Sequence, residues 1–169
     1  MTKKKEEKDE LDPLDLGILE TLQADCKMPL AKIGEKVGLS AAAVIERVRK
    51  LEEHGIVLGY HAILDSRRLG LAVTAFVGVT VNYQNVAGSM EAQLGRIPEI
   101  LEVHWITGDH SLLLKVKVES PAMLEGLLAR LRTVAGIERT HTMIALSSPV
   151  ERATIAVDPA KRNQPVKRA

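Results

Sequence analysis

A short break between two helical segments constrains the fold of this chain more than any other feature. Residues 29–37 and 41–54 both carry apolar side chains at helical spacing, and only Gly38, Leu39 and Ser40 separate them. Two helices joined by so short a glycine-containing turn must cross steeply. The sequence therefore predicts a helix-turn-helix corner in the N-terminal part of the chain.

Local capping signals define the helices around this corner. Asp12 and Pro13 are typical of an N-cap followed by the first helical residue, and apolar residues then recur every four positions up to about Asp25. Ser40 is a second N-cap, and Gly55 suits the left-handed position that ends a helix. We predict a three-helix domain over residues 11–55, whose last helix is of the kind that enters the major groove of DNA.

Strand-like alternation replaces helical spacing after this domain. A connector is expected over residues 56–71 and a second domain over residues 72–149, between a flexible tail at 1–10 and a largely flexible C-terminal extension at 150–169. The elements expected in the second domain are strands at 73–81, 100–107, 112–118 and 137–146, and helices at 86–96 and from 120. The order βαββαβ predicts a ferredoxin-like antiparallel sheet with both helices on one face, so the whole chain is of the α+β class.

The face of this sheet away from the helices is expected to carry apolar groups. Leu113 shares that side with Lys115 and Lys117, and Phe76 and Trp105 lie on neighbouring strands. A small sheet with apolar side chains on an open face is poorly stable alone, and a second copy of the chain is an economical cover. The sequence therefore predicts a homodimer at least.

Composition excludes several classes of protein. The formal net charge is +1, so any basic surface must be local, and only 2% of the residues are aromatic, which disfavours stacking on unpaired bases. No apolar run approaches the roughly 18 residues needed to span a membrane. The single cysteine, Cys26, forms no internal disulfide, and no signal peptide is apparent. A cytoplasmic location is expected.

Five segments in order resemble one known family. They read LDPLDLGILETLQAD, LAKIGEKVGLS, RVRKLEEHGIVLGYHAILD, IPEILEVHWITGDHSLLLKV and GIERTHTMIAL. Together they resemble the Lrp/AsnC, or feast/famine, transcription regulators. The resemblance implies a non-enzymatic protein that binds double-stranded DNA, forms dimers and higher assemblies such as octamers, and binds an amino acid or related metabolite near a glycine turn of the second domain.

The candidate DNA-binding residues lie on the last helix of the first domain and at its N-cap. They are Ser40, Ala41, Ala42, Ala43, Glu46, Arg47, Arg49 and Lys50. The basic side chains are expected to contact phosphates, whereas the alanines can only touch thymine methyl groups or allow close approach. We therefore expect modest sequence selectivity, supported by DNA shape and by several contacts from an oligomer.

The candidate effector-binding residues surround the glycine turn and the last strand. They are Gly108, Asp109, His110, Ser111, Thr140 and Thr142. Ser111 stands where the family has an aspartate, and a neutral hydroxyl loses the charge-assisted hydrogen bond to an amino group. Asp109 would point elsewhere on a regular strand. A free amino acid, a different ligand, a weak site and no ligand all remain open.

No metal ion or cofactor is expected. His104, His110 and His141 lie on or near adjacent strands, but neither cysteines nor a dense set of carboxylates accompany them. Two other functions remain alternatives. The sirohaem decarboxylases resemble the same two-domain arrangement, and an architectural DNA-binding protein would need no effector.

Overall fold

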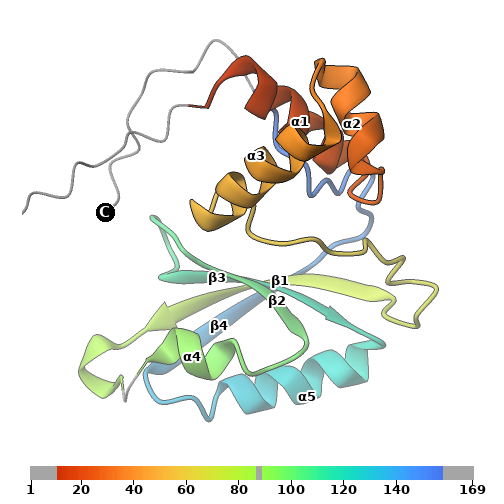
Figure 1. The fold of residues 1–169 in the computed structure, drawn as a ribbon. Helices are drawn as coiled ribbons and strands as arrows, with labels where there is room; N and C mark the ends of the chain where they lie inside the picture. Colours follow the sequence, from red (N-terminus) through yellow and green to blue (C-terminus); the bar gives the residue numbers. More distant parts are fainter. Residues whose placement is uncertain (1–10, 87–88, 158–169) are drawn as a thin grey trace, which may run out of the picture. The chain divides into compact units, whose positions relative to one another are not determined.

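A computed structural model of the chain describes residues 11–86 and 89–157 (Figure 1). The chain divides into two compact units. Among the described residues, the first consists of residues 11–62 and 151–157, and the second of residues 63–86 and 89–150. The expected tail at 1–10 and the end of the C-terminal extension, from residue 158, lie outside the described residues.

The first unit contains the three expected helices: α1 (Pro13–Ala24), α2 (Leu30–Val37) and α3 (Ala41–Glu53). The Asp12 side chain accepts hydrogen bonds from the backbone N–H groups of Leu14 and Asp15, and the Asp15 carboxylate accepts one from the Asp12 N–H. This reciprocal capping box fixes where α1 begins. One apolar core joins the three helices, and its buried members are Ile18, Leu22, Ile33, Val44 and Leu51.

Two glycines make the corner between α2 and α3 possible. Gly38 ends α2 in the left-handed conformation, with φ 75°, which is the expected helix terminus. Gly34 faces the chain as it returns, and a Cβ atom at this position would collide with the carbonyl oxygen of Leu39. The absence of a side chain at Gly34 therefore allows the turn to pack directly against α2.

The second unit is a four-stranded antiparallel sheet in the order β2-β3-β1-β4. The strands are β1 (Val73–Val81), β2 (Ile100–Trp105), β3 (Leu112–Val118) and β4 (Ile137–Ile144), and the main helices are α4 (Met90–Leu94) and α5 (Pro121–Leu131). Both helices cover the same face of the sheet (Figure 1). The predicted α+β class and ferredoxin-like order are confirmed.

The helix after β1 is much shorter than the expected 86–96. A 3₁₀ turn, η1 (Tyr83–Asn85), precedes it, and residues 87–88 lie outside the described part of the chain. The Ser89 hydroxyl oxygen accepts a hydrogen bond from the Ala92 N–H and so begins α4. The helix ends before Gly95 after five residues. The strands expected at 100–107 and 137–146 also end two residues early.

The helices cover the face of the sheet that bears the alternating leucines and valines of β3. Leu112, Leu114, Val116 and Val118 are buried there, as expected, whereas Leu113 is only partly buried on the opposite, open face. Trp105, which we expected near the open face, lies on the face that the helices cover. It pairs with Leu112, and its indole N–H donates to the Glu91 carboxylate of α4 at 2.9 Å.

The beginning of the C-terminal extension belongs to the first unit. The Gln23 side chain of α1 accepts from the Ile155 N–H at 2.8 Å and donates to the Ile155 carbonyl at 3.1 Å. Gln23 therefore satisfies both polar backbone groups of one residue in the extension, which tethers this segment to α1. No helix of the described residues is long and apolar enough to cross a membrane.

Candidate functional site

The exposed face of α3 displays most of the candidate DNA-binding residues. Val44 and Leu51 are buried beneath it, so helical periodicity directs the side chains of Ala42, Glu46 and Arg49 outward. Ala41 and Lys50 are exposed as well, and Ala43 is partly buried. The Ser40 hydroxyl oxygen accepts from the Ala43 N–H at 3.2 Å, so Ser40 caps the helix as expected.

Arg49 is engaged along its own helix. Its guanidinium donates to the Glu46 carboxylate at 2.6 and 3.2 Å and also binds Glu53. Hydrogen bonds that Arg49 donates to Glu46, and then to Glu53, raise the pKa of Arg49 above its ordinary value. Two carboxylates therefore neutralise the cation in the unbound protein. Phosphate binding by Arg49 would require their displacement.

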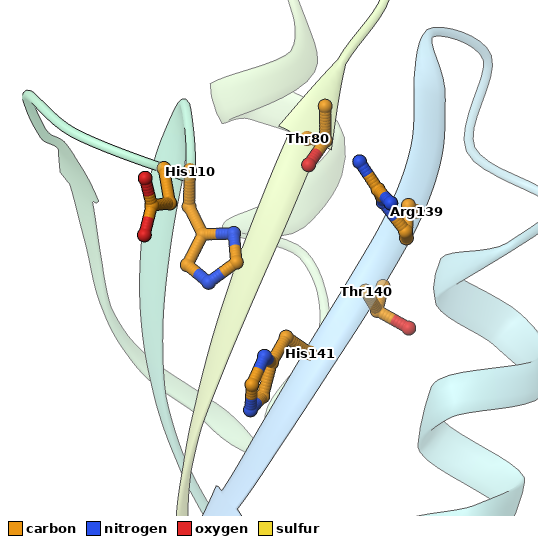
Figure 2. Close-up of a pocket in the computed structure, with 6 residues that line it drawn as sticks. Thr80, His110, Arg139, Thr140 and His141 are labelled. Atoms are coloured by element: carbon orange, nitrogen blue, oxygen red, sulfur yellow. The ribbon is translucent and has the colours of Figure 1, made fainter.

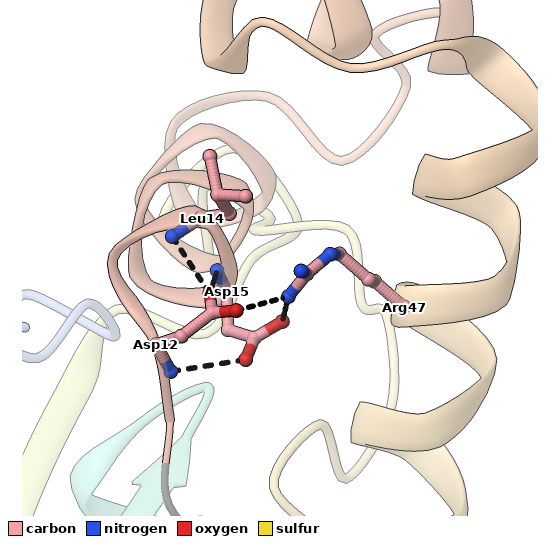
Figure 3. Close-up of polar contacts among 4 residues, drawn as sticks. All are labelled: Asp12, Leu14, Asp15 and Arg47. Atoms are coloured by element: carbon pink, nitrogen blue, oxygen red, sulfur yellow. Dashed lines mark hydrogen bonds and ion pairs between the residues drawn. The ribbon is translucent and has the colours of Figure 1, made fainter.

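Arg47 points into the first unit (Figure 3). One guanidinium nitrogen lies 2.7 Å from a carboxylate oxygen of Asp12 and 2.7 Å from one of Asp15, and the Arg47 side chain is 28% exposed. Hydrogen bonds that Arg47 donates to Asp15, and then to Asp12, raise the pKa of Arg47. Burial alone would raise the pKa of Asp12, but the Asp15 backbone N–H and the Arg47 side chain hold it below its usual value. Arg47 thus joins the capping box of α1 to the middle of α3.

A second candidate site is a shallow cavity of about 590 Å³ at one end of the sheet in the second unit. It is lined by Thr80, Asp109, His110, Arg139, Thr140 and His141 (Figure 2). Three of the six candidate effector residues line this cavity: Asp109, His110 and Thr140. Arg139 extends toward Thr80, and the hydroxyl of Thr140 points away from the two imidazoles.

The other three candidate effector residues lie outside the cavity lining. Gly108 is exposed in the turn with φ 111°, and Thr142 pairs with Val77 deeper in the sheet. The Ser111 hydroxyl oxygen accepts from the Val81 N–H at 3.2 Å, and the Ser111 N–H donates to the Val79 carbonyl at 2.8 Å. Ser111 therefore anchors the glycine turn to β1.

Thr80, Arg139 and His141 line the cavity and were absent from the sequence-based set. Antiparallel pairing places Arg139 opposite Thr80 and His141 opposite Gly78. Arg139 and His141 alternate with Thr140 and Thr142 along β4, and Thr140 lines the cavity with both of them, whereas Thr142 does not. The positive charge of Arg139, one position from Thr140, is the sequence signal that could have added Arg139 to the candidate set.

Gly78 provides the space that His110 occupies. A Cβ atom on Gly78 would collide with the imidazole ring of His110, which therefore lies directly on the backbone of β1. The His110 and His141 rings meet edge to face, with centroids 5.5 Å apart. The Nδ1 atom of His110 is buried and has no hydrogen-bond partner within the described chain. Among the described residues, no group of three or more histidine, cysteine, aspartate or glutamate side chains could hold a metal ion.

Comparisons with known proteins match both units. An AsnC-type helix-turn-helix domain matches residues 11–52, and an Lrp/AsnC ligand binding domain matches residues 74–155. The HTH-type transcriptional regulator FL11 of Pyrococcus horikoshii is 35% identical over 150 residues, which cover 87% of this chain and 97% of the relative.

Two solved structures show the same arrangement of elements. The leucine response regulatory protein LrpA of Mycobacterium tuberculosis matches with a TM-score of 0.76 and 34% identity, over 83% of this chain and 96% of that one. The transcriptional regulator NMB0573 of Neisseria meningitidis, solved in complex with L-Met, matches with a TM-score of 0.78 and 25% identity, over 86% of this chain and 96% of that one. On these grounds, the chain belongs to the Lrp/AsnC family.

Proposed function

We propose that this protein is a transcription regulator that binds double-stranded DNA through α3. The observation that carries the proposal is the short turn from Gly38 to Ser40, after which the capped helix α3 presents an exposed outer face in the manner of a recognition helix. Two relatives that are each 35% identical to this chain are named as HTH-type transcriptional regulators. Lys50 contributes an exposed positive charge on this face, and phosphate contacts of this kind supply much of the affinity for DNA.

The salt dependence of binding tests the proposed contact. Each neutralised phosphate adds about 0.9 to the log-log slope of affinity against salt. Lys50→Ala should therefore lower the slope by about one, whereas Arg152→Ala, a charge deletion in the exposed C-terminal segment, should leave it unchanged. Fluorescence anisotropy with duplex fragments measures both slopes. If the protein did not bind duplex DNA at low ionic strength, the proposed function would be refuted.

We further propose that the cavity beside Arg139 binds a zwitterionic effector such as an α-amino acid. Asp109 and Arg139 line the same cavity, so one carboxylate is available for an ammonium group and one guanidinium for a carboxylate. The negative charge that is missing at Ser111 is thus supplied by Asp109. A relative of the same fold was solved with L-Met, which agrees with an effector of this class.

Calorimetric titration with a panel of amino acids tests the effector. Arg139→Gln should abolish binding of any amino acid that the unmodified protein binds, because the ligand carboxylate loses its charged partner. Arg132→Gln, at the exposed end of α5, is the matched control and should bind normally. If the Arg139→Gln variant bound the amino acid as tightly as the unmodified protein does, this cavity would not be the effector site.

A further inference from the structure

An exposed apolar patch occupies the first two turns of α3. Ile45 is 52% exposed, whereas the preceding residue, Val44, is fully buried. Ala41 lies four residues before Ile45 and Ala42 three residues before it, so the three side chains are neighbours on the helix surface. We call Ala41, Ala42 and Ile45 the α3 apolar patch.

The polar groups around this patch already have partners. The Ser40 hydroxyl oxygen accepts a hydrogen bond at the helix N-terminus, and Glu46 is bound to Arg49. The two alanines and Ile45 offer no side-chain donor or acceptor. The part of α3 that a recognition helix directs at base edges therefore presents mainly methyl groups.

Thymine is the base that offers an apolar partner for such a surface. In the major groove it displays a C5-methyl group, whereas the other three bases display only hydrogen-bonding groups there. We propose that Ile45, supported by Ala41 and Ala42, selects thymine by direct contact with this methyl group. This proposal rests on the proposed DNA binding through α3 and adds a specificity-determining residue to it.

The size of the effect follows from the chemistry of one methyl group. Burial of a single CH₂ or CH₃ group changes an equilibrium constant by about three- to fivefold. Deoxyuridine pairs as thymidine does but lacks the C5-methyl group. Replacing a contacted thymidine by deoxyuridine should therefore weaken binding of the full-length protein by about three- to fivefold, and replacements elsewhere should have little effect.

The experiment combines DNA and protein variants. A duplex selected for binding from random sequences is substituted with deoxyuridine one position at a time, and dissociation constants are measured for each variant protein. Ile45→Ala should lose the preference for thymidine over deoxyuridine at the sensitive positions. Ile45→Val should retain part of it. Ile155→Ala changes another exposed isoleucine in the same unit, 77% exposed, and should retain the full preference.

The outcomes separate this proposal from the proposed function. If the unmodified protein binds duplex DNA but no deoxyuridine substitution weakens binding, methyl readout is refuted while DNA binding stands. If Ile45→Ala keeps the same methyl preference, Ile45 is not the reader. If no duplex is bound, both proposals fail. Circular dichroism confirms that Ile45→Ala is folded, as expected for an exposed helical position where alanine is the better helix former.

Discussion

Arg47 shows how one side chain fixes the position of a helix that must present a surface. It lies in the middle of α3, but its guanidinium binds Asp12 and Asp15 at the start of α1. The sequence alone suggested a phosphate contact for Arg47, since it lies among other basic residues of the same helix. The pairing with two carboxylates some thirty residues earlier became apparent only when the helices were packed.

Removing this cation should destabilise the first unit. Arg47→Met should lower the free energy of unfolding by about 1–2 kcal/mol at pH 7, because two partly buried carboxylates lose a charged donor. Urea denaturation of the full chain, followed by circular dichroism, measures the change. Arg152→Met, which alters an exposed arginine, should change stability by less than about 0.5 kcal/mol.

The pH dependence follows from the direction of the Asp12 shift. Its pKa in the folded protein lies below the ordinary value of 3.8, so the pairing stabilises the fold above that value. The contribution is lost as the pH falls through the lowered pKa and the carboxyl gains a proton. The stability difference between the unmodified protein and Arg47→Met should therefore shrink below about pH 4. A constant difference from pH 7 to pH 3 would mean that Arg47 acts through packing alone.

Gly78 and His110 form a second residue-level pair, and a double-mutant cycle tests it. Gly78→Ala should cost about 1–3 kcal/mol because the new methyl group displaces the His110 ring. In a His110→Ala background the same substitution should cost nothing, since the space is then empty. Thermal denaturation of the four proteins gives the coupling energy. Equal costs in both backgrounds would show that the imidazole does not occupy this space in solution.

At the scale of elements, the start of a helix was predicted correctly where a capping side chain next to it sets that start. The bounds of α1 and α3 followed from Asp12 and Ser40, each of which forms the capping hydrogen bond that the sequence indicated. The length of α4 did not follow from the sequence, because Ser89 caps a helix that begins at Met90, four residues later than the apolar spacing suggested. A side-chain cap acts within one helical turn and can be recognised in the sequence. Where two residues could each begin a helix, packing against the rest of the unit decides between them.

The corner between α2 and α3 depends on the backbone conformation of Gly38. Its φ of 75° is unfavourable for any residue with a Cβ atom, although no neighbouring atom would contact that Cβ. Gly38→Ala should therefore lower stability by about 1–2 kcal/mol without any steric clash. Gly126→Ala is the matched control, because it lies in open space within α5 and should raise stability by about 0.5–1 kcal/mol. Chemical denaturation shows whether each substitution lowers or raises the free energy of unfolding.

At the scale of the whole molecule, the strand order of the sheet was predictable from the sequence, but the side of the sheet on which Trp105 lies was not. Alternation in β3 placed its apolar residues correctly, because the pairing of β3 with β1 runs without a register shift. The register of β2 against β3 shifts between Ile100 and Glu102, and this irregularity turns the rest of β2 over. Trp105 consequently faces α4. Apolar Leu101, Val103 and Trp105 alternate with polar Glu102 and His104, so the change of phase after Ile100 is visible in the sequence once the bulge is known.

The open face of the sheet leads to a prediction about assembly. Phe76 and Leu113 lie partly exposed on this face between charged groups, and Met143 is 43% exposed on the neighbouring strand. We expect a second copy of the chain to cover them. Leu113→Glu should then dissociate the assembly, because burying two unpaired carboxylates at an interface between copies costs several kcal/mol, or more than a hundredfold in the dissociation constant.

Sedimentation velocity over a range of protein concentrations measures this change. Met123→Glu places the same charge on an apolar residue of α5 that is 50% exposed on the helix side, and it should leave the assembly intact. If both variants dissociate, copies of the chain associate through the helices as well. If Leu113→Glu sediments like the unmodified protein, the open face is not the interface between copies. The partly exposed apolar side chains of β1 and β3 would then lie in contact with solvent.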